Sequence, residues 1–474
     1  MDDRFGRRVY LLSPRQLSPE TIAVTFAKTS RSPLSFAEIA AELTDAKSAE
    51  FHEKWVVGYG HASVAEHAVL HVAFENVSRL AVEAIESSRL ASYTEKSTRY
   101  QKWDPESFHV PVEVIGAPVE ARYRQICERL FDAYQRSLGP VQAVVQKSTP
   151  RRSEESDERW DGRIRSRYVD ACRYLLPMAA LANVGMTANA RVLEHALGKM
   201  LAHPLAEVRE IGDELRRVAQ VELPTLLKYA EPAGYLPETE AALGALAPGT
   251  RFAAGQGPLR LVAFDPQAEV RVLAAALYPH GEASFGELEA HVSSLGRGAR
   301  ARLIAELLGR LGRFEVPLRA LEHAVYTVEA VLDQGAYFEL KRHRMMTLTP
   351  QRLTTRHGFA VPRLMEEAGL GQDYQAGMDA AADAFEELAA WNPDVAAYGV
   401  PNGFNRRVLM TLNLRQVYHL CELRAAANAH FAMRRLALGL AELIRQVHPS
   451  LAGFLRLPEG ATSRSIEEEH FSKV

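Results

Sequence analysis

The sequence predicts an α/β protein of the α+β type, in which a domain with a small sheet flanked by helices occurs twice. The length of 474 residues is natural for two domains and leaves ample core in each. Short motifs recur in the same order in the two halves. In each half, a stretch with strand-like alternation precedes helical patterns.

The repeat is visible as short matches at drifting offsets. The matched stretches are 35–38 (SFAE) with 284–287 (SFGE), 66–69 (EHAV) with 322–325 (EHAV), 176–177 (LP) with 400–401 (VP), and 189–191 (NAR) with 413–415 (NLR). Loop insertions produce such a drift. Four matches in one order indicate a duplication, and the long period indicates two domains rather than a solenoid.

We assign residues 1–232 to a first repeat, 233–261 to a linker and 262–474 to a second repeat. The linker is rich in proline and glycine and lies between two helical patterns, which is typical of a joint between domains. A charged stretch at 148–164 is expected to be a solvated loop or the start of a helix.

Each repeat should contain a strand followed by a helix. Residues 68–75 and 324–331 alternate in the manner of strands, and the helix after each should end near the motifs at 87 and 342. Each repeat should finish in a long helix. These helices are expected over 188–201 and over 411–447, where apolar residues form a stripe.

Composition and charge exclude several classes of function. The chain has 56 Lys and Arg against 59 Asp and Glu, a net charge of -3, which argues against bulk electrostatic binding of nucleic acid. Its three cysteines form no CxxC pair, so neither a disulfide framework nor a zinc site is expected. The sequence shows no signal-peptide pattern and no apolar run of membrane-spanning length. We expect a cytoplasmic globular protein.

Two segments look like incomplete copies of one motif. Residues 87–100 read SSRLASYTEKSTRY, and residues 342–354 read RHRMMTLTPQRLT. Each resembles one end of RHRxxSxxExSxRY, the signature of the flavin-dependent thymidylate synthases. The first copy has Ser87 and Ser88 where the first Arg and the His belong. The second copy has Pro350, Arg352 and Thr354 where Glu, Ser and Arg belong.

The resemblance implies the fold of that family, FAD as cofactor, and NADPH and methylenetetrahydrofolate as co-substrates that convert dUMP to dTMP. It assigns flavin binding to the triplet Arg342, His343 and Arg344, and to Arg89 in the first copy. From spacing alone, the triplet would be a basic cluster that complements a helix dipole. Arginine suits the family's task because its fork binds phosphate and its plane stacks on rings.

The other half of the motif is implied to bind the substrate. Glu95, Ser97 and Arg99 match the positions that hold dUMP in the family. A hydroxyl and a guanidinium form a sensible phosphate cradle, and a carboxylate accepts from a sugar hydroxyl. No base is visible beside Ser97, so a nucleophilic role for this serine is not expected.

A third segment, 401–424, resembles the family's LPxxxxTRxxxxxNxRxLxxxxxLR and is expected to be helical. The resemblance implies that Arg424 binds and polarises the uracil base as the catalytic arginine and that Arg407 binds the substrate phosphate. It places Asn413 and Arg415 near the flavin, with His419 one helical turn after Arg415. The first repeat keeps Asn189 and Arg191 as the equivalent cofactor contacts but has Asn183 and Met200 in place of the two substrate arginines.

Single residues complete the candidate site. His61 occupies the position of a flavin-contacting histidine, whereas His67 and His323 are expected to have structural roles at the strand entries. The family has Gln three residues before its triplet, and this chain has Ala84 and Glu339 there.

The losses in the two repeats are complementary, which predicts a composite site with Glu95, Ser97 and Arg99 facing Arg407 and Arg424. The family's sites form where subunits of a homotetramer meet, so we expect a homodimer that mimics the tetramer. Two alternatives remain. The first is a degenerate, non-catalytic flavin- or nucleotide-binding protein, favoured by the missing Gln. The second is an enzyme that methylates another uridine nucleotide, because Thr94 and Thr349 stand where the family often has Asn.

Overall fold

The computed structural model describes residues 8–58, 62–247 and 257–474. The chain forms two compact units. Unit 1 comprises Met1–Lys96, Ser107–Glu120 and Ala179–Thr250, and unit 2 comprises Ser97–Glu106, Ala121–Met178 and Arg251–Val474. A large part of the first repeat therefore folds with the second repeat.

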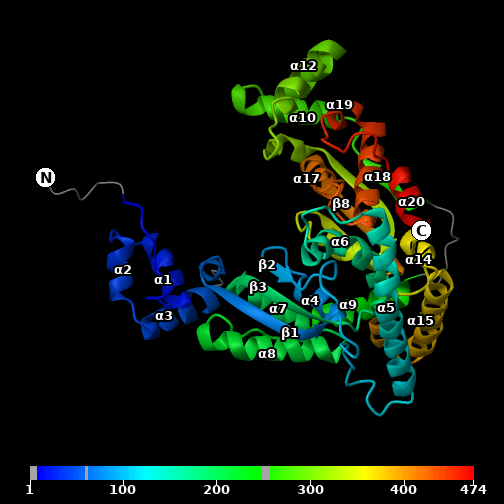
Figure 1. The fold of residues 1–474 in the computed structure, drawn as a ribbon. Helices are drawn as coiled ribbons and strands as arrows, with labels where there is room; N and C mark the ends of the chain where they lie inside the picture. The colour runs from blue at the N-terminus through cyan, green and yellow to red at the C-terminus, as the bar shows by residue number, and fades with distance from the viewer. Residues whose placement is uncertain (1–7, 59–61, 248–256) are drawn as a thin grey trace. The chain divides into compact units, whose positions relative to one another are not determined.

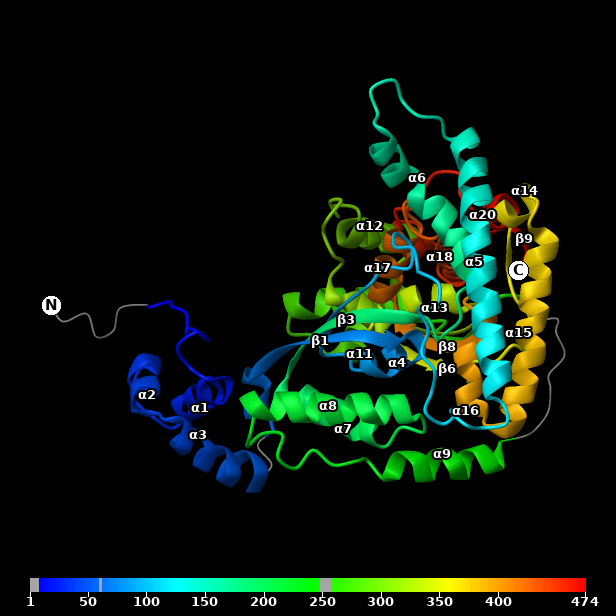
Figure 2. The ribbon, with the colours of Figure 1, turned by 60° about the horizontal axis from the view of Figure 1, so that its bottom comes forward.

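Unit 1 contains an antiparallel sheet of three strands, in the order β1 (Val69–Ser78), β3 (Leu181–Asn189) and β2 (Ser92–Glu95). Helix α4 (Arg79–Ile85) follows β1, as the sequence predicts, and begins at a Ser78 side-chain cap. Helices α7 (Ala190–Leu201) and α8 (Ala206–Glu222) lie against one face of the sheet (Figure 2). Helices α1 (Pro19–Thr29), α2 (Phe36–Glu42) and α3 (Asp45–His52) precede β1 (Figure 1).

Unit 2 repeats this sheet and adds a strand. The order is β4 (Leu259–Phe264), β5 (Val325–Asp333), β8 (Asn405–Asn413) and β6 (Thr347–Pro350). The register is the same in both units, because Val69 faces Asn189 in one and Val325 faces Asn413 in the other. The predicted α+β class and both predicted strands are confirmed.

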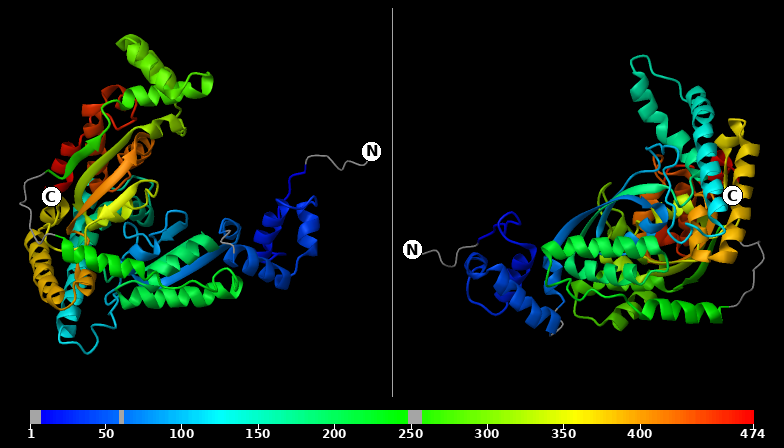
Figure 3. Two further views of the ribbon diagram at one scale, coloured as in Figure 1. Left: turned by 180° about the vertical axis from the view of Figure 1, so that it is seen from behind. Right: turned by 90° about the horizontal axis from the view of Figure 1, so that it is seen from below.

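The capping motifs explain the first sequence match. Ser35 and Glu38 form a capping box at the start of α2, and Ser284 and Glu287 form the same box at the start of α11 (Phe285–Ser294). In a capping box, the serine hydroxyl and the glutamate carboxylate bond backbone N–H groups that the helix leaves unsatisfied. Helices α10 (Ala268–Leu277), α11 and α12 (Arg297–Leu308) precede β5 in unit 2 (Figure 3).

The long helix predicted over 411–447 is wrong. The segment contains the end of β8, helix α17 (Leu414–Arg424), a turn, and helix α18 (Phe431–Val447), which packs against β4 and β5. The buried His430 side chain caps α18 by accepting from the Ala432 N–H. The first repeat has the corresponding pair α7 and α8, of which α7 was predicted over 188–201.

Unit 2 joins the repeats through equivalent segments. Helix α5 (Glu120–Ser148) of the first repeat lies antiparallel to α15 (Gly371–Trp391) of the second (Figure 2). Arg122 lies 3.1 Å from Glu387, and Arg129 donates to the Ala376 carbonyl at 3.1 Å. The turns after α6 (Asp157–Cys172) and α16 (Pro393–Ala396) also contact each other, and they too are equivalent segments of the two repeats.

The meeting point of these turns has local two-fold symmetry. Pro177 faces Pro401 in a β-bridge, and these prolines are equivalent in the two repeats. The Met178 N–H donates to the Val400 carbonyl, and the Asn402 N–H donates to the Leu176 carbonyl, each at 3.0 Å. Such self-complementary contacts are those of an isologous dimer interface, here formed within one chain.

The segment assigned as a linker contains helix α9 (Tyr235–Leu246) and the start of β4, and its residues 248–256 lie outside the described residues. The charged stretch at 148–164 contains the end of α5, a turn and the start of α6, as expected. Among the described helices, none combines the length and the apolar character needed to cross a membrane.

Candidate functional site

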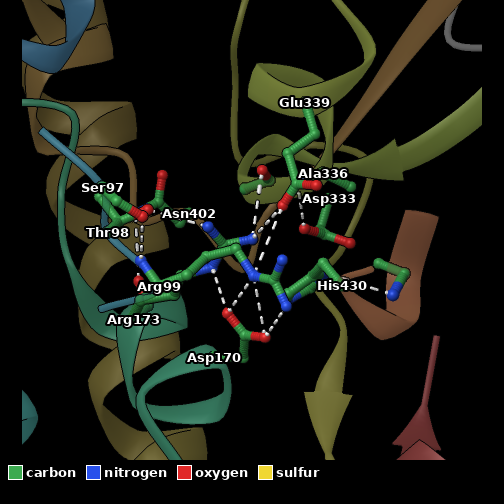
Figure 4. A network of polar contacts seen from close by, with 12 residues as sticks. Ser97, Thr98, Arg99, Asp170, Arg173, Asp333, Ala336, Glu339, Asn402 and His430 are labelled. Carbon is green, nitrogen blue, oxygen red and sulfur yellow. Dashed lines mark hydrogen bonds and ion pairs between the residues drawn. The ribbon is translucent and has the colours of Figure 1, made fainter. Parts of the chain in front are cut away.

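A cluster of charged side chains lies within unit 2 and combines residues of both repeats. Arg99 comes from the turn after β2, Asp170 from α6, and Arg173 from the short helix η3 (Arg173–Leu175). Glu339 lies near the end of α13 (Gln334–Leu340), and Arg424 is the last residue of α17. Figure 4 shows Arg99 and Arg173 between Asp170 and Glu339.

Arg99 is held by the protein on two sides. Its Nε and NH2 groups donate to the Asp170 carboxylate at 2.9–3.1 Å, and NH1 and NH2 donate to the Asn428 carbonyl at 3.2 Å. Burial by itself lowers the pKa of Arg99, but the Asp170 carboxylate outweighs this and raises it. Arg99 is thus a fixed cation at the turn between α17 and α18.

Glu339 is the anion on which three guanidiniums converge. Its Oε2 accepts from Arg424 NH1 at 2.9 Å, and its main-chain carbonyl accepts from Arg424 NH2 at 3.2 Å. Its Oε1 lies 3.5 Å from Arg173 NH2 and 3.9 Å from Arg99 Nε. The Glu339 side chain is only 6% exposed, so these charges act in a desolvated environment.

His343 accepts the remaining hydrogen bond described for the Arg424 side chain. The Arg424 Nε donates to His343 Nε2 at 3.0 Å, and the His419 ring lies 5.5 Å from the His343 ring. Burial, followed by the Arg424 cation, lowers the pKa of His343 to about 3, so the ring is neutral at physiological pH. Because Nε2 accepts, Nδ1 carries the proton.

The Nδ1 group of His343 is buried and has no hydrogen-bond partner among the described residues. An unpaired buried donor costs free energy unless a ligand supplies an acceptor. The carbonyl and nitrogen acceptors of an isoalloxazine ring are of this kind, so the site fits the implied FAD. Arg342 and Arg344 flank His343 in the turn after α13, with Arg342 exposed and Arg344 half-buried.

Burial lowers the pKa of Arg424, and the neighbouring Arg342 and Arg99 cations add to this effect, whereas Glu339 opposes it. Arg342 and Arg99 are therefore each close enough to repel Arg424. A concentration of positive charge of this kind attracts anionic ligands.

Arg407 lies on a strand and not on the helix expected over 401–424. Strand β8 places it opposite Val331, and its NH1 donates to Glu329 on β5 at 3.1 Å. The helical part of the segment begins only at Leu414. The structure pairs Arg407 with an acidic neighbour, as it does Arg424.

Asn413 and Asn189 have the same structural role. Each accepts from a backbone N–H and caps the helix that follows, α17 or α7. Arg415 donates to Glu322 at 3.0 Å, and Arg191 forms the equivalent ion pair with Glu66. These contacts explain why both repeats keep the asparagine and the arginine without any reference to a cofactor.

The front motif is divided between the units. Glu95 belongs to unit 1, where its buried side chain pairs with Arg79, whereas Ser97 and Arg99 belong to unit 2. In the second repeat, Gln334 and Pro350 stand at the equivalent positions, so both members of the Arg79–Glu95 pair are replaced. Arg89 is exposed in the turn after α4, and His61 lies outside the described residues.

Two residues of the cluster had no signal in the motifs. Asp170 and Arg173 lie in the run YVDACRYLLP, where a buried ion pair three residues apart looks like ordinary helix polarity. Glu339 stood out only because it replaces a glutamine, and its contacts with three arginines depend on the tertiary structure.

Comparisons with known proteins support the resemblance. The family model described as thymidylate synthase complementing protein matches residues 13–225 and 260–450. A UPF0159 protein of Chlamydia muridarum is 29% identical over 434 residues, which cover 88% of this chain and 82% of that protein. A UPF0159 protein of Thermoplasma acidophilum is 28% identical over 451 residues, which cover 86% of this chain and 89% of that protein.

A flavin-dependent thymidylate synthase of Nitratidesulfovibrio vulgaris is 28% identical over 207 residues, which cover 42% of this chain and 74% of that protein. This span corresponds to about one repeat. The family model matches once in each half and covers more than half of the chain. The chain therefore belongs to the thymidylate synthase complementing protein family, whose sequence unit it contains twice.

Proposed function

We propose that this protein is a flavin-dependent thymidylate synthase that methylates dUMP to dTMP. The methylene group would come from methylenetetrahydrofolate, and NADPH would supply the electrons through FAD. Family membership supports the reaction class. The charged cluster of unit 2 supports a site that binds an anionic nucleotide.

One observation carries the proposal. Arg99 of the first repeat and Arg424 of the second both form ion pairs with the Glu339 carboxylate. Neither repeat has both arginines, because Thr354 and Met200 stand at the equivalent positions. The fold thus brings together, within one unit, two arginines that this chain supplies from different repeats.

The residues divide the work as follows. Arg424 donates to a uracil carbonyl and stabilises negative charge that develops on the ring, and His343 orients its guanidinium. The Ser97 hydroxyl, the Arg99 guanidinium and Arg407 hold the phosphate. His343 Nδ1, with Arg342 and Arg344, holds FAD, which supplies hydride chemistry when bound.

Assembly is part of the proposal. The local two-fold symmetry at Pro177 and Pro401 gives one chain the kind of contact that two identical subunits make. A homodimer of such chains would reproduce a tetrameric arrangement, with one functional class of site and one vestigial class.

The alternative is a non-catalytic protein that binds a flavin or a nucleotide. The observation that favours it is that each nitrogen of the Arg424 guanidinium already donates one hydrogen bond, to Glu339 or to His343. Methylation of a uridine nucleotide other than dUMP is a second alternative, and the same assay with that nucleotide in place of dUMP tests it.

The test is conversion of dUMP to dTMP by the purified chain with FAD, NADPH and methylenetetrahydrofolate. Arg424→Met, which introduces the residue of the first repeat, should lower turnover by about 100-fold or more, because the uracil loses its donor. Thr354→Arg is the matched control in the vestigial motif and should leave turnover unchanged. A yellow protein whose flavin spectrum ignores every uridine nucleotide would favour the non-catalytic alternative.

A further inference from the structure

Glu339 is placed where a ligand would be expected to meet the arginines. We propose that Glu339 is a specificity-determining residue whose carboxylate serves as the pocket's own anion, so that a nucleotide must compete with it for Arg424. The identity of the nucleotide rests on the proposed function, whereas the competition rests on the contacts of unit 2 alone.

The contacts of Arg424 carry the first step. NH1 and NH2 donate to Glu339, and Nε donates to His343. The Arg424 side chain is 15% exposed, so water offers little alternative hydrogen bonding. NH1 and NH2 each keep one further N–H, but the Glu339 carboxylate occupies the side of NH1 that faces the cluster, so a ligand acceptor on that side competes with Glu339.

The second step concerns an alternative partner for the Glu339 carboxylate when a ligand takes its place on Arg424. Its Oε1 accepts no hydrogen bond from any described residue, although Arg173 NH2 lies at 3.5 Å and Arg99 Nε at 3.9 Å. The Nε of Arg173 likewise has no hydrogen-bond partner among those residues. Figure 4 shows Arg173 between Glu339 and Asp170. A small rotation of the Glu339 side chain towards Arg173 would exchange one charged partner for another and release NH1 of Arg424, while NH2 keeps the main-chain carbonyl of Glu339.

The third step is the charge of the pocket. Three guanidiniums, those of Arg99, Arg173 and Arg424, share direct ion pairs with two carboxylates, those of Asp170 and Glu339. A neutral glutamine at 339 would remove one of these two ion-pairing carboxylates, and the remaining acidic groups would be Asp170 and Asp333, which acts on Arg173 electrostatically. Glu339 thus lowers the affinity of the pocket for anions and favours a neutral group, such as a pyrimidine ring, beside Arg424.

The experiment compares the full chain with its Glu339→Gln variant in two assays. Titration with dUMP, followed by flavin absorbance, should give a Kd about tenfold lower for the variant, the size of one charge-assisted hydrogen bond. Thermal unfolding should show a lower Tm for the variant in chloride. Inorganic phosphate at equal ionic strength should raise the Tm of the variant more than that of the unmodified chain.

Glu322→Gln is the matched control, because it removes a carboxylate that pairs with Arg415 elsewhere in unit 2. It should show no phosphate-specific rise in Tm. Glu339→Asp is a second test variant in case Glu339→Gln fails to fold. It keeps the negative charge, but its shorter side chain reaches Arg424 less well. It should tighten dUMP binding about two- to threefold.

Unchanged or weaker dUMP binding in both Glu339 variants, or an equal phosphate effect in all chains, would overturn the inference. If no chain converts dUMP but phosphate still stabilises Glu339→Gln selectively, the proposed reaction is wrong. The inference that the Glu339 carboxylate competes with anionic ligands is then still supported.

Discussion

His343 provides a quantitative test of the electrostatics at the centre of the site. The structure buries its ring against Arg424, and its pKa falls from the ordinary 6.5 to about 3. Replacing His343 by glutamine keeps a hydrogen-bond acceptor for Arg424 but removes the titrating group. The two chains should therefore differ in how their stability depends on pH.

The sign and size follow from proton linkage. Between pH 6.5 and pH 3, the unfolded chain binds a proton at this residue and the folded chain does not, so stability falls as the pH falls. At pH 5, an unfolded pKa of 6.5 corresponds to a loss of about 2 kcal/mol relative to pH 8. The loss at pH 5 is almost the same for any folded pKa below about 4.

The assay is thermal unfolding of both chains from pH 8 to pH 5. The unmodified chain should lose about 2–4 °C more than His343→Gln over this range. All other titrating groups are common to both chains and cancel in the comparison. Parallel Tm profiles would refute the reasoning, because they would mean that His343 takes up a proton as readily in the folded chain as in the unfolded one.

Three further predictions concern ligands and assembly. The chain should bind FAD non-covalently at about one per chain, since only the 342–344 triplet is intact, and flavin absorbance against protein concentration measures this ratio. Arg99→Ala should weaken dUMP binding by about 1.5–3 kcal/mol and retain FAD, whereas Arg342→Ala should do the reverse, as spectral titration would show. If Arg99→Ala strips the flavin instead, the two motifs have exchanged roles. Residues 1–240 and 255–474 expressed separately should be inactive, because α5 and α6 pack in unit 2, and mixing them should recover some turnover.

The local elements of the fold follow from sequence patterns, and the break in the last helix does not. Strands β1 and β5 are predicted by the alternation of apolar and polar residues, which is a local property of the sequence. The run AAANA after Arg424 has good helix propensity, so nothing local ends the helix there. The turn instead binds Arg99 through the Asn428 carbonyl, a contact between residues 329 positions apart.

The same limit applies to the site. The motifs identify Arg99, Arg424 and His343 by type and spacing. They cannot show that Glu339 would join two of these residues, because that contact depends on how α13 and α17 pack. Nor can they show that Glu95 and Ser97, two positions apart, belong to different compact units.

The bridge between Pro177 and Pro401 has a consequence for concentration. Separate subunits associate in a bimolecular step, so a site that they share is lost when dilution dissociates the subunits. Tethering the partners in one polypeptide replaces that bimolecular step by an intramolecular one, with an effective concentration that reaches about millimolar for short linkers. The contact between Arg99 and the Glu339–Arg424 pair should therefore survive at any dilution at which the chain itself stays folded.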